Sequence, residues 1–161
     1  MATFQKVYEE FAQPVYRFLL SLAGDENFAE ELLQETFYQA LQHIDKFEGR
    51  CSLYTWLCQI GKNAWTREIQ RNNRYCDLSW DELTIPAEGP SLETQVITKD
   101  EYRRAHRAMQ KLKDPYRDVF IMHAIGGIKL KEIACIYRKS ESWARVTYFR
   151  ARQQIAQEVQ K

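Results

Sequence analysis

The chain has 161 residues, of which 45% are hydrophobic; this composition excludes a disordered chain but leaves room only for one domain or two small ones. No apolar run is long enough to cross a bilayer, and residues 1–10 lack the apolar region of a signal peptide, so we expect a cytoplasmic protein that does not insert into a membrane. The four cysteines form no CxxC pair and have no histidine at zinc-ligand spacing, so we predict reduced structural cysteines, no metal site and no cofactor.

The net charge of +1 is unevenly distributed along the chain. Residues 1–75 carry eight basic and ten acidic side chains (−2), residues 76–98 carry none and five (−5), and residues 99–161 carry fifteen and seven (+8). The last third is therefore a candidate for binding nucleic acid, whereas the middle segment should repel it.

Residues 4–22 have apolar side chains at every third or fourth position, which predicts an amphipathic helix. Pro14 lies inside this pattern and predicts a kink or a break into two helices near Gln13. Residues 23–27 end the segment, and either Asp25 or Asn27 can cap the next helix.

The next predicted helix covers about residues 28–44. Its expected buried positions are Leu32, Leu33, Phe37, Ala40, Leu41 and Ile44. Its outward positions are mainly acidic: Glu30, Glu31, Gln34, Glu35 and Gln39. By itself this pattern is typical of an ordinary solvated face, with acids near the helix N-terminus where the helix dipole favours them.

Residues 47–74 combine a short glycine-containing loop with a helix in which Ser52 is the expected N-cap. One stripe of this helix is apolar and predicted to be buried: Leu53, Leu57, Ile60 and Ala64. The other positions interleave rings with cations: Tyr54, Trp56, Trp65, Lys62, Arg67, Arg71 and Arg74. Such a mixture can be ordinary core packing, but it also suits single-stranded nucleic acid, whose bases stack on rings while its phosphates attract cations.

Residues 76–98 contain no basic side chain and show no sustained period, which predicts an acidic linker. Apolar side chains such as Trp80 indicate that part of it packs on a domain or partner. The helical period returns at about residue 98 with a predicted buried stripe of Tyr102, Ala105, Met109 and Leu112. A further helix is expected over residues 115–125, with His123 as a packed core residue or a surface residue.

The last segment predicts a helix-turn-helix, with helices at residues 130–137 and about 141–159. The second helix is expected to bury Ala144, Tyr148, Ala151 and Ile155. The residues expected near or on its exposed side are then Trp143, Arg145, Val146, Phe149, Arg150 and Arg152. A basic solvated helix is one interpretation; the other is a major-groove reader, in which Arg145 forms a fork to guanine while apolar groups meet thymine methyls.

Three motifs in this order resemble the extracytoplasmic-function sigma factors, small bacterial transcription initiation factors of the sigma-70 family. The promoter-melting motif of that family matches Phe47, Gly49, Ser52, Trp56, Leu57, Ile60, Gly61, Lys62 and Asn63, where Gly61 and Lys62 replace the usual alanine and arginine. Residues 29–37, AEELLQETF, are similar to the family segment that docks on the clamp helices of RNA polymerase. Arg150-Ala151-Arg152 matches the triplet that commonly ends the recognition helix of the family, although Ser142, Ala144 and Tyr148 stand where glycine, valine and leucine are usual.

The resemblance implies two small all-α domains joined by an acidic linker, with boundaries at residues 1–75, 76–98 and 99–161. It implies a transcription factor without catalytic residues, whose partners are core RNA polymerase, promoter DNA and an anti-sigma factor. The implied polymerase contacts are Glu31, Gln34 and Glu35. The implied minus-10 DNA contacts are Phe47, Gly49, Ser52, Tyr54, Trp56, Lys62, Asn63 and Arg67. The implied minus-35 contacts are Lys139, Trp143, Arg145, Val146, Phe149 and Arg150.

Two alternatives stay open on the sequence alone. One is a dimeric helix-turn-helix regulator with an N-terminal helical sensing domain, which would need no base-capturing loop at residues 47–52. The other is a helical adaptor that binds only proteins, which would have no use for Arg145 and Phe149 on an exposed face.

Overall fold

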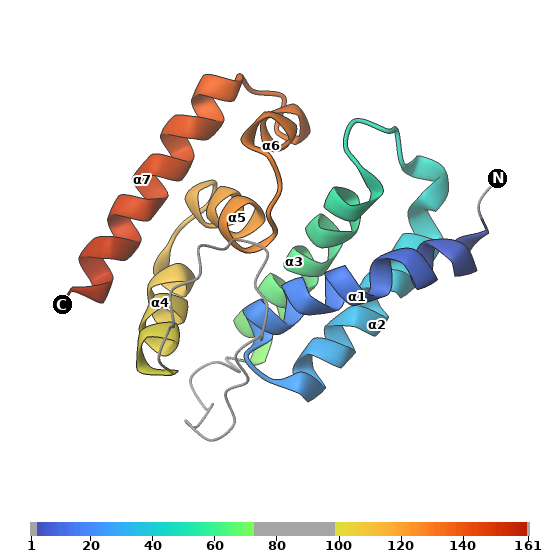
Figure 1. Cartoon of the computed structure of the whole chain (residues 1–161), viewed down its shortest axis with the longest axis horizontal. Helices are drawn as coiled ribbons and strands as arrows, with labels where there is room; N and C mark the ends of the chain where they lie inside the picture. The colour runs from blue at the N-terminus through green and yellow to red at the C-terminus, as the bar shows by residue number, and fades with distance from the viewer. Residues whose placement is uncertain (1–2, 73–98, 161) are drawn as a thin grey trace. The chain divides into compact units, whose positions relative to one another are not determined.

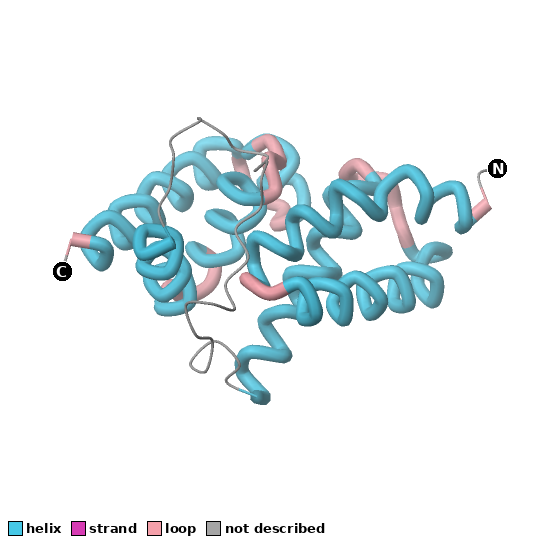
Figure 2. Tube along the Cα trace, turned by 60° about the horizontal axis from the view of Figure 1, so that its bottom comes forward, coloured by secondary structure: helices cyan, strands magenta, loops and turns pink. Residues whose placement is uncertain are grey.

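The computed structural model describes residues 3–72 and 99–160, which form helices and short loops without a strand (Figures 1 and 2). The chain divides into two compact units, Met1–Gly89 and Pro90–Lys161. The all-α prediction with two helical domains is confirmed. The predicted boundaries at residues 75 and 98 and the acidic linker lie outside or at the edge of the described residues, so they stay predictions.

The first unit contains α1 (Phe4–Ala23), α2 (Glu26–His43), the short 3-10 helix η1 (Ile44–Lys46) and α3 (Leu53–Asn72), and its three long helices all pack on one another. Gly24 ends α1 in the left-handed region at φ 70°, and its N–H donates to the Leu20 carbonyl at 2.9 Å. Asp25 then caps α2, because its carboxylate accepts from the Phe28 N–H at 2.8 Å.

Of the two outcomes predicted near Gln13, the break into two helices is wrong, because α1 is one helix of 20 residues with Pro14 inside it, and the kink stays a prediction. Proline lacks one N–H and therefore removes one helical hydrogen bond. The second half of α1 nevertheless carries Val15, Phe18 and Leu19, all fully buried, so tertiary packing holds the helix where its local sequence weakens it.

The buried face of α2 differs from the predicted one at its C-terminal end. Leu41 and Ile44, predicted to be buried, are 54% and 37% exposed. The core instead takes Thr36, which is fully buried because its hydroxyl donates to the Leu32 carbonyl at 2.6 Å. That bond offsets the cost of burying a hydroxyl, so a polar residue replaces an apolar one in the packing.

Close approach of α3 to the other two helices depends on Gly61. A Cβ atom at this position would lie 2.8 Å from Leu19 Cδ2 and 3.0 Å from Thr36 Oγ1. This contact widens the buried face of α3 beyond the predicted stripe, and Thr55, Lys62 and Trp65 are buried with it.

The second unit contains α4 (Lys99–Lys111), α5 (Tyr116–Phe120), the π-helical turn η4 (Ile121–Ile125), α6 (Leu130–Ile136) and α7 (Glu141–Val159). The predicted helix at residues 115–125 is thus present but changes its winding halfway. The N–H of Gly126 donates to the Ile121 carbonyl at 3.0 Å. This bond joins residues five positions apart, one more than in an α-helix, and so defines a π turn. A Cβ at Gly126 would lie 2.7 Å from the Met122 carbonyl oxygen.

Helix α7 packs against α4, α5 and α6 and completes this unit. In α4 the predicted burial of Ala105 is wrong: Ala105 is exposed, and His106 is buried beside Met109. His106 stays inside next to the Tyr102 ring, whose centroid is 4.5 Å away. A periodicity that counts only apolar residues misses this histidine.

Candidate nucleic-acid and partner interfaces

The outer face of α2 changes from acidic to apolar along the helix. Glu31, Gln34 and Glu35 are exposed as predicted, and Glu35 accepts a hydrogen bond from the Gln39 amide at 2.7 Å. The face continues with Tyr38, 59% exposed, and with Leu41. Exposed large apolar side chains beside carboxylates are typical of a surface that binds a basic, partly apolar partner. The sequence interpretation missed Tyr38, whose only signal was its place directly after the buried Phe37.

The loop before α3 brings two predicted DNA residues into contact. The rings of Phe47 and Trp56 lie 5.2 Å apart and both are half-buried. Gly49, at φ 76°, has the left-handed conformation that favours glycine, and a Cβ there would meet only open space. Ser52 is the predicted cap: its hydroxyl accepts from the Thr55 N–H at 3.2 Å. The loop is therefore anchored at its helical end and exposed at its tip.

Tyr54 lies half-buried in the first turns of α3, next to Cys58. Burial, followed by the neighbouring Cys58, raises the pKa of the Tyr54 phenol well above its ordinary value. Burial likewise raises the pKa of the Cys58 thiol, so the reactive thiolate is disfavoured. Both groups therefore stay neutral, which fits a structural role for Cys58.

The remaining predicted minus-10 residues separate into two groups. Asn63 and Arg67 are exposed on α3, one helical turn apart. Lys62, predicted to lie beside them, is instead buried with only 2% of its surface exposed. Lys62 directly follows Gly61, whose backbone lies close against Leu19 and Thr36.

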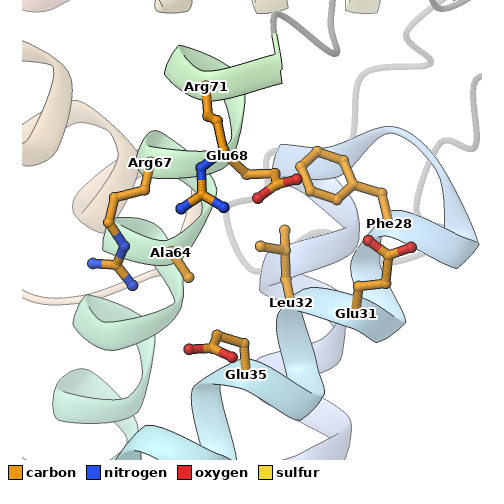
Figure 3. Close-up of a pocket in the computed structure, with 8 residues that line it drawn as sticks. All are labelled: Phe28, Glu31, Leu32, Glu35, Ala64, Arg67, Glu68 and Arg71. Carbon is orange, nitrogen blue, oxygen red and sulfur yellow. The ribbon is translucent and has the colours of Figure 1, made fainter.

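A pocket of about 290 Å³ lies between α2 and α3 (Figure 3). Its lining residues come from both helices: Phe28, Glu31, Leu32, Glu35, Ala64, Arg67, Glu68 and Arg71. The pocket places two of the predicted polymerase residues next to a predicted DNA residue. Sequence periodicity cannot find such a juxtaposition, because it depends on how the two helices pack.

The exposed face of α7 has the side chains expected for it. Val146 and Phe149 are 48% and 59% exposed, and Arg145 and Arg150 lie beside them in exposed positions. The helix begins at a capped end, where Ser140 Oγ accepts from the Trp143 N–H at 3.0 Å. Val146 and Phe149 are three positions apart on one helix, so they form a small exposed apolar patch beside the two cations.

Arg145 is preoriented by an ion pair within its own helix. Its Nη2 lies 3.1 Å from Glu141 Oε1, and the two side chains are 66% and 45% exposed. Such exposed pairs are weak, so a base edge can compete for the guanidinium.

The inner face of α7 buries Ala144, Thr147 and Ala151, while Tyr148 and Ile155, predicted to be buried, are only half-buried.

The turn before α7 is held by backbone and side-chain hydrogen bonds to the preceding helices. Arg138 has a φ of 56°, and the Lys139 N–H donates to the Ala134 carbonyl at 2.9 Å, which closes the end of α6. The Tyr137 hydroxyl donates to Asp118 Oδ2 at 3.0 Å, and the Tyr137 ring lies 5.6 Å from that of the half-buried Trp143. Lys139 is exposed at the tip of this turn.

Within the described ranges, no helix combines the length and the apolar character needed to span a membrane.

Comparison with known families finds two matches that follow the two units. The family described as Sigma-70 region 2 matches residues 7–75, and the family described as Sigma-70, region 4 matches residues 102–155. Among curated relatives, the ECF RNA polymerase sigma factor SigX of Bacillus subtilis is 30% identical over 153 residues, covering 92% of this chain and 79% of the relative. The factor SigM of the same organism is 29% identical over 153 residues, covering 95% of this chain and 93% of the relative.

Two solved structures share the fold. CnrH, in complex with the cytosolic domain of CnrY, has a TM-score of 0.62 at 21% identity and covers 95% of this chain and 84% of its own. The sigma factor RpoE of Bartonella quintana, in complex with the anti-sigma factor NepR, has a TM-score of 0.61 at 20% identity and covers 98% and 96%. Both family matches are to sigma-70 regions, and they do not favour the alternative of a dimeric regulator with a sensing domain.

Proposed function

Since the chain belongs to the sigma-70 family, as a transcription initiation factor of the extracytoplasmic-function type that directs core RNA polymerase to promoters, we propose how its described surfaces divide that work. In this division α2 binds polymerase, residues 47–67 open the minus-10 element, and α7 reads the minus-35 element. The chain itself would carry no catalytic group; the chemistry of RNA synthesis belongs to polymerase.

The observation that carries the proposal is the exposed face of α7. Arg145 and Arg150 stand beside Val146 and Phe149 in the N-terminal half of a capped helix, the part of a helix-turn-helix that enters the major groove. We assign base reading to Arg145, Val146 and Phe149. Lys139, at the exposed turn, and Arg150 would contact phosphates and position the helix.

The minus-10 element would be captured by the loop at residues 47–52 and the start of α3. Phe47 and Trp56 offer partly exposed rings on which an unstacked base can stack, while Asn63 and Arg67 lie exposed further along the helix. Ser52 supports this site indirectly, because its hydroxyl caps α3. Lys62 is buried and has no place in this proposed contact surface.

Polymerase would bind the outer face of α2. The exposed Glu31, Gln34 and Glu35 suit a basic helix, and Tyr38 and Leu41 extend the surface with apolar area. We further propose that an anti-sigma factor regulates the chain in the cytoplasm, since the similar structures of CnrH and RpoE were obtained with CnrY and with the anti-sigma factor NepR.

The test is reconstituted transcription. Purified chain and core polymerase are incubated with fragmented genomic DNA, and transcript 5′ ends are sequenced. We expect starts at a small set of sites that core polymerase alone does not use, and no such starts would overturn the proposal.

Charge reversal on α2 tests the polymerase surface in the same assay. Glu35→Lys should abolish these starts and the binding of core polymerase. Glu10→Lys makes the same charge change at an exposed position of α1 and should leave both intact. Equal behaviour of the two variants would remove the proposed polymerase face.

A further inference from the structure

Side chains from three helices meet at the turn between α6 and α7 (Figure 1). Tyr137 is the C-cap of α6, and its hydroxyl donates to Asp118 Oδ2 of α5 at 3.0 Å. The ring of Tyr137 also lies 5.6 Å from that of Trp143, in the first turn of α7, at an interplanar angle of 46°. One half-buried side chain therefore joins α5 to the start of α7.

The backbone of this turn needs support from its surroundings. Arg138 has a left-handed φ of 56°, which residues with a side chain rarely adopt, so neighbouring contacts must hold it there. The bond from the Lys139 N–H to the Ala134 carbonyl ties the turn to α6. The Tyr137 hydroxyl adds a bond to α5, which itself packs against α7.

The Tyr137 phenol remains a hydrogen-bond donor. Burial, followed by the negative charge of Asp118, raises the pKa of this phenol well above its ordinary value. The hydroxyl therefore keeps its proton, and the bond to Asp118 is made at any pH at which the protein works.

Base reading by α7 tolerates little movement of that helix. At a radius of about 5–6 Å, which includes side chains, a rotation of about 10° around the helix axis moves a side chain by about 1 Å. Hydrogen bonds from N–H groups to oxygen span only about 2.7–3.2 Å. Such a rotation would therefore break the proposed fork from Arg145 to guanine. It would change the attraction between cations and phosphates much less, because that attraction falls off gradually with distance.

We propose that Tyr137 is a positioning residue for recognition of the minus-35 element. Anchored by Asp118 and packed against Trp143, it holds α7 in the rotation at which Arg145 reaches its base. Trp143 serves here as the packing contact through which α7 is held. This inference rests on the proposed function of α7 and on base reading by Arg145, and it adds to them the device that orients the helix.

The test uses core polymerase carrying the full chain and a promoter found by the transcription assay above. The base pair read by Arg145 is the one whose replacement no longer matters with Arg145→Ala. Open-complex formation is measured on the promoter and on a copy with this base pair replaced, and the ratio of the two equilibrium constants is the discrimination ratio. A change that lowers only stability or general DNA affinity affects both promoters equally and leaves this ratio unchanged.

Tyr137→Phe keeps the ring beside Trp143 but removes the bond to Asp118. It should lower the discrimination ratio by about two- to tenfold, the range that one hydrogen bond can contribute to a preferred orientation. In a chain that also carries Arg145→Ala it should lower the ratio no further, because the side chain that it positions is gone. Asp118→Ala removes the acceptor and should lower the ratio as well, without adding to the effect of Tyr137→Phe.

Ile133→Val is the control matched for stability. Ile133 is fully buried in α6, and the loss of one methyl group there should cost about as much stability as the loss of one hydrogen bond. The variant keeps the bond between Tyr137 and Asp118, so its discrimination ratio should equal that of the unchanged chain. Circular dichroism melting gives the stability of each variant.

An unchanged ratio for Tyr137→Phe would overturn the inference. An equal fall of the ratio for Ile133→Val at equal loss of stability would also do so, because the effect would then follow stability alone. A further fall when Tyr137→Phe is added to Arg145→Ala would show that Tyr137 does not act through Arg145. If Arg145→Ala itself leaves discrimination intact at every base pair, the proposed base reading fails, so the two failures are distinguishable.

Discussion

Replacement of Arg145 by alanine should remove discrimination at one base pair of the minus-35 element while leaving the second unit folded. In the free protein Arg145 is held only by Glu141, at 3.1 Å within one helix and with both side chains well exposed. Such a pair contributes about 0.3–0.5 kcal/mol. A bidentate contact to guanine contributes about 1–3 kcal/mol of discrimination. Because the base contact contributes more free energy than the ion pair, loss of binding specificity should exceed loss of stability.

The assay compares one promoter with a panel in which each base pair of the minus-35 element is replaced in turn. Open-complex formation is measured for polymerase carrying the unchanged chain or the Arg145→Ala variant. With the unchanged chain, replacement of the base pair that Arg145 reads should make the free energy of open-complex formation less favourable by about 1–3 kcal/mol. With Arg145→Ala, replacement of that base pair should change open-complex formation very little, while replacements at the other positions should have the same effect as before.

Two controls separate base reading from general attraction. Lys139→Ala removes an exposed cation at the turn before α7 and should weaken all promoters of the panel about equally. Glu141→Gln removes the ion-pair partner but keeps Arg145, so discrimination should persist. If Arg145→Ala also weakened matched and mismatched promoters equally, Arg145 would be a phosphate contact and the base-reading assignment would be wrong.

Three further predictions concern the core, the strand site and the turn. Gly61→Ala should lower the free energy of unfolding by roughly 0–2 kcal/mol, because overpacking against Leu19 costs about 1–3 kcal/mol and the higher helix propensity of alanine offsets about 1 kcal/mol of this. Denaturant unfolding would measure the change. A clear gain in stability would contradict the close contact. Asn63→Ala should spare polymerase binding but impair strand opening, since Asn63 is exposed on α3 and does not line the pocket that α3 shares with α2; normal permanganate reactivity of the minus-10 thymines would count against it. Tyr137→Phe should cost about 0.5–1.5 kcal/mol of stability through loss of the 3.0 Å hydrogen bond to Asp118, and thermal melting unchanged from that of the parent chain would show that the bond contributes nothing.

Helix positions and the two-domain organisation could be predicted because apolar residues recur with the helical period, and that signal survives local exceptions. The exceptions share one physical cause. Thr36 is buried because its hydroxyl bonds to its own helix, and Pro14 stays helical because its neighbours are packed. In each case a tertiary or side-chain contact outweighs the local preference, which is exposure for threonine and a helix break for proline.

The candidate site was predictable to a different degree in each unit. On α7 the buried Ala144 and Ala151 fix the opposite face, so the exposure of Arg145 and Phe149 follows from one helix alone. On α3 the burial of Lys62 depends on how closely three helices meet, and nothing within α3 reports that distance. The pocket shared by α2 and α3 could not be predicted from the sequence for the same reason.

The π-helical turn η4 constrains the number of residues in the chain as well as their chemistry. A π turn holds one residue more than an α turn, and the helix ends directly after this one, with Gly127 in the left-handed region at φ 70°. Downstream of it, Ile128 is buried, and its N–H donates to the Met122 carbonyl at 3.0 Å. Deleting a single residue between Met122 and Ile128 would break this hydrogen bond and shift the start of α6. The segment before the helix-turn-helix should therefore tolerate substitutions far better than changes in length, whereas the exposed loop around Gly49 should accept both insertions and deletions without unfolding its unit.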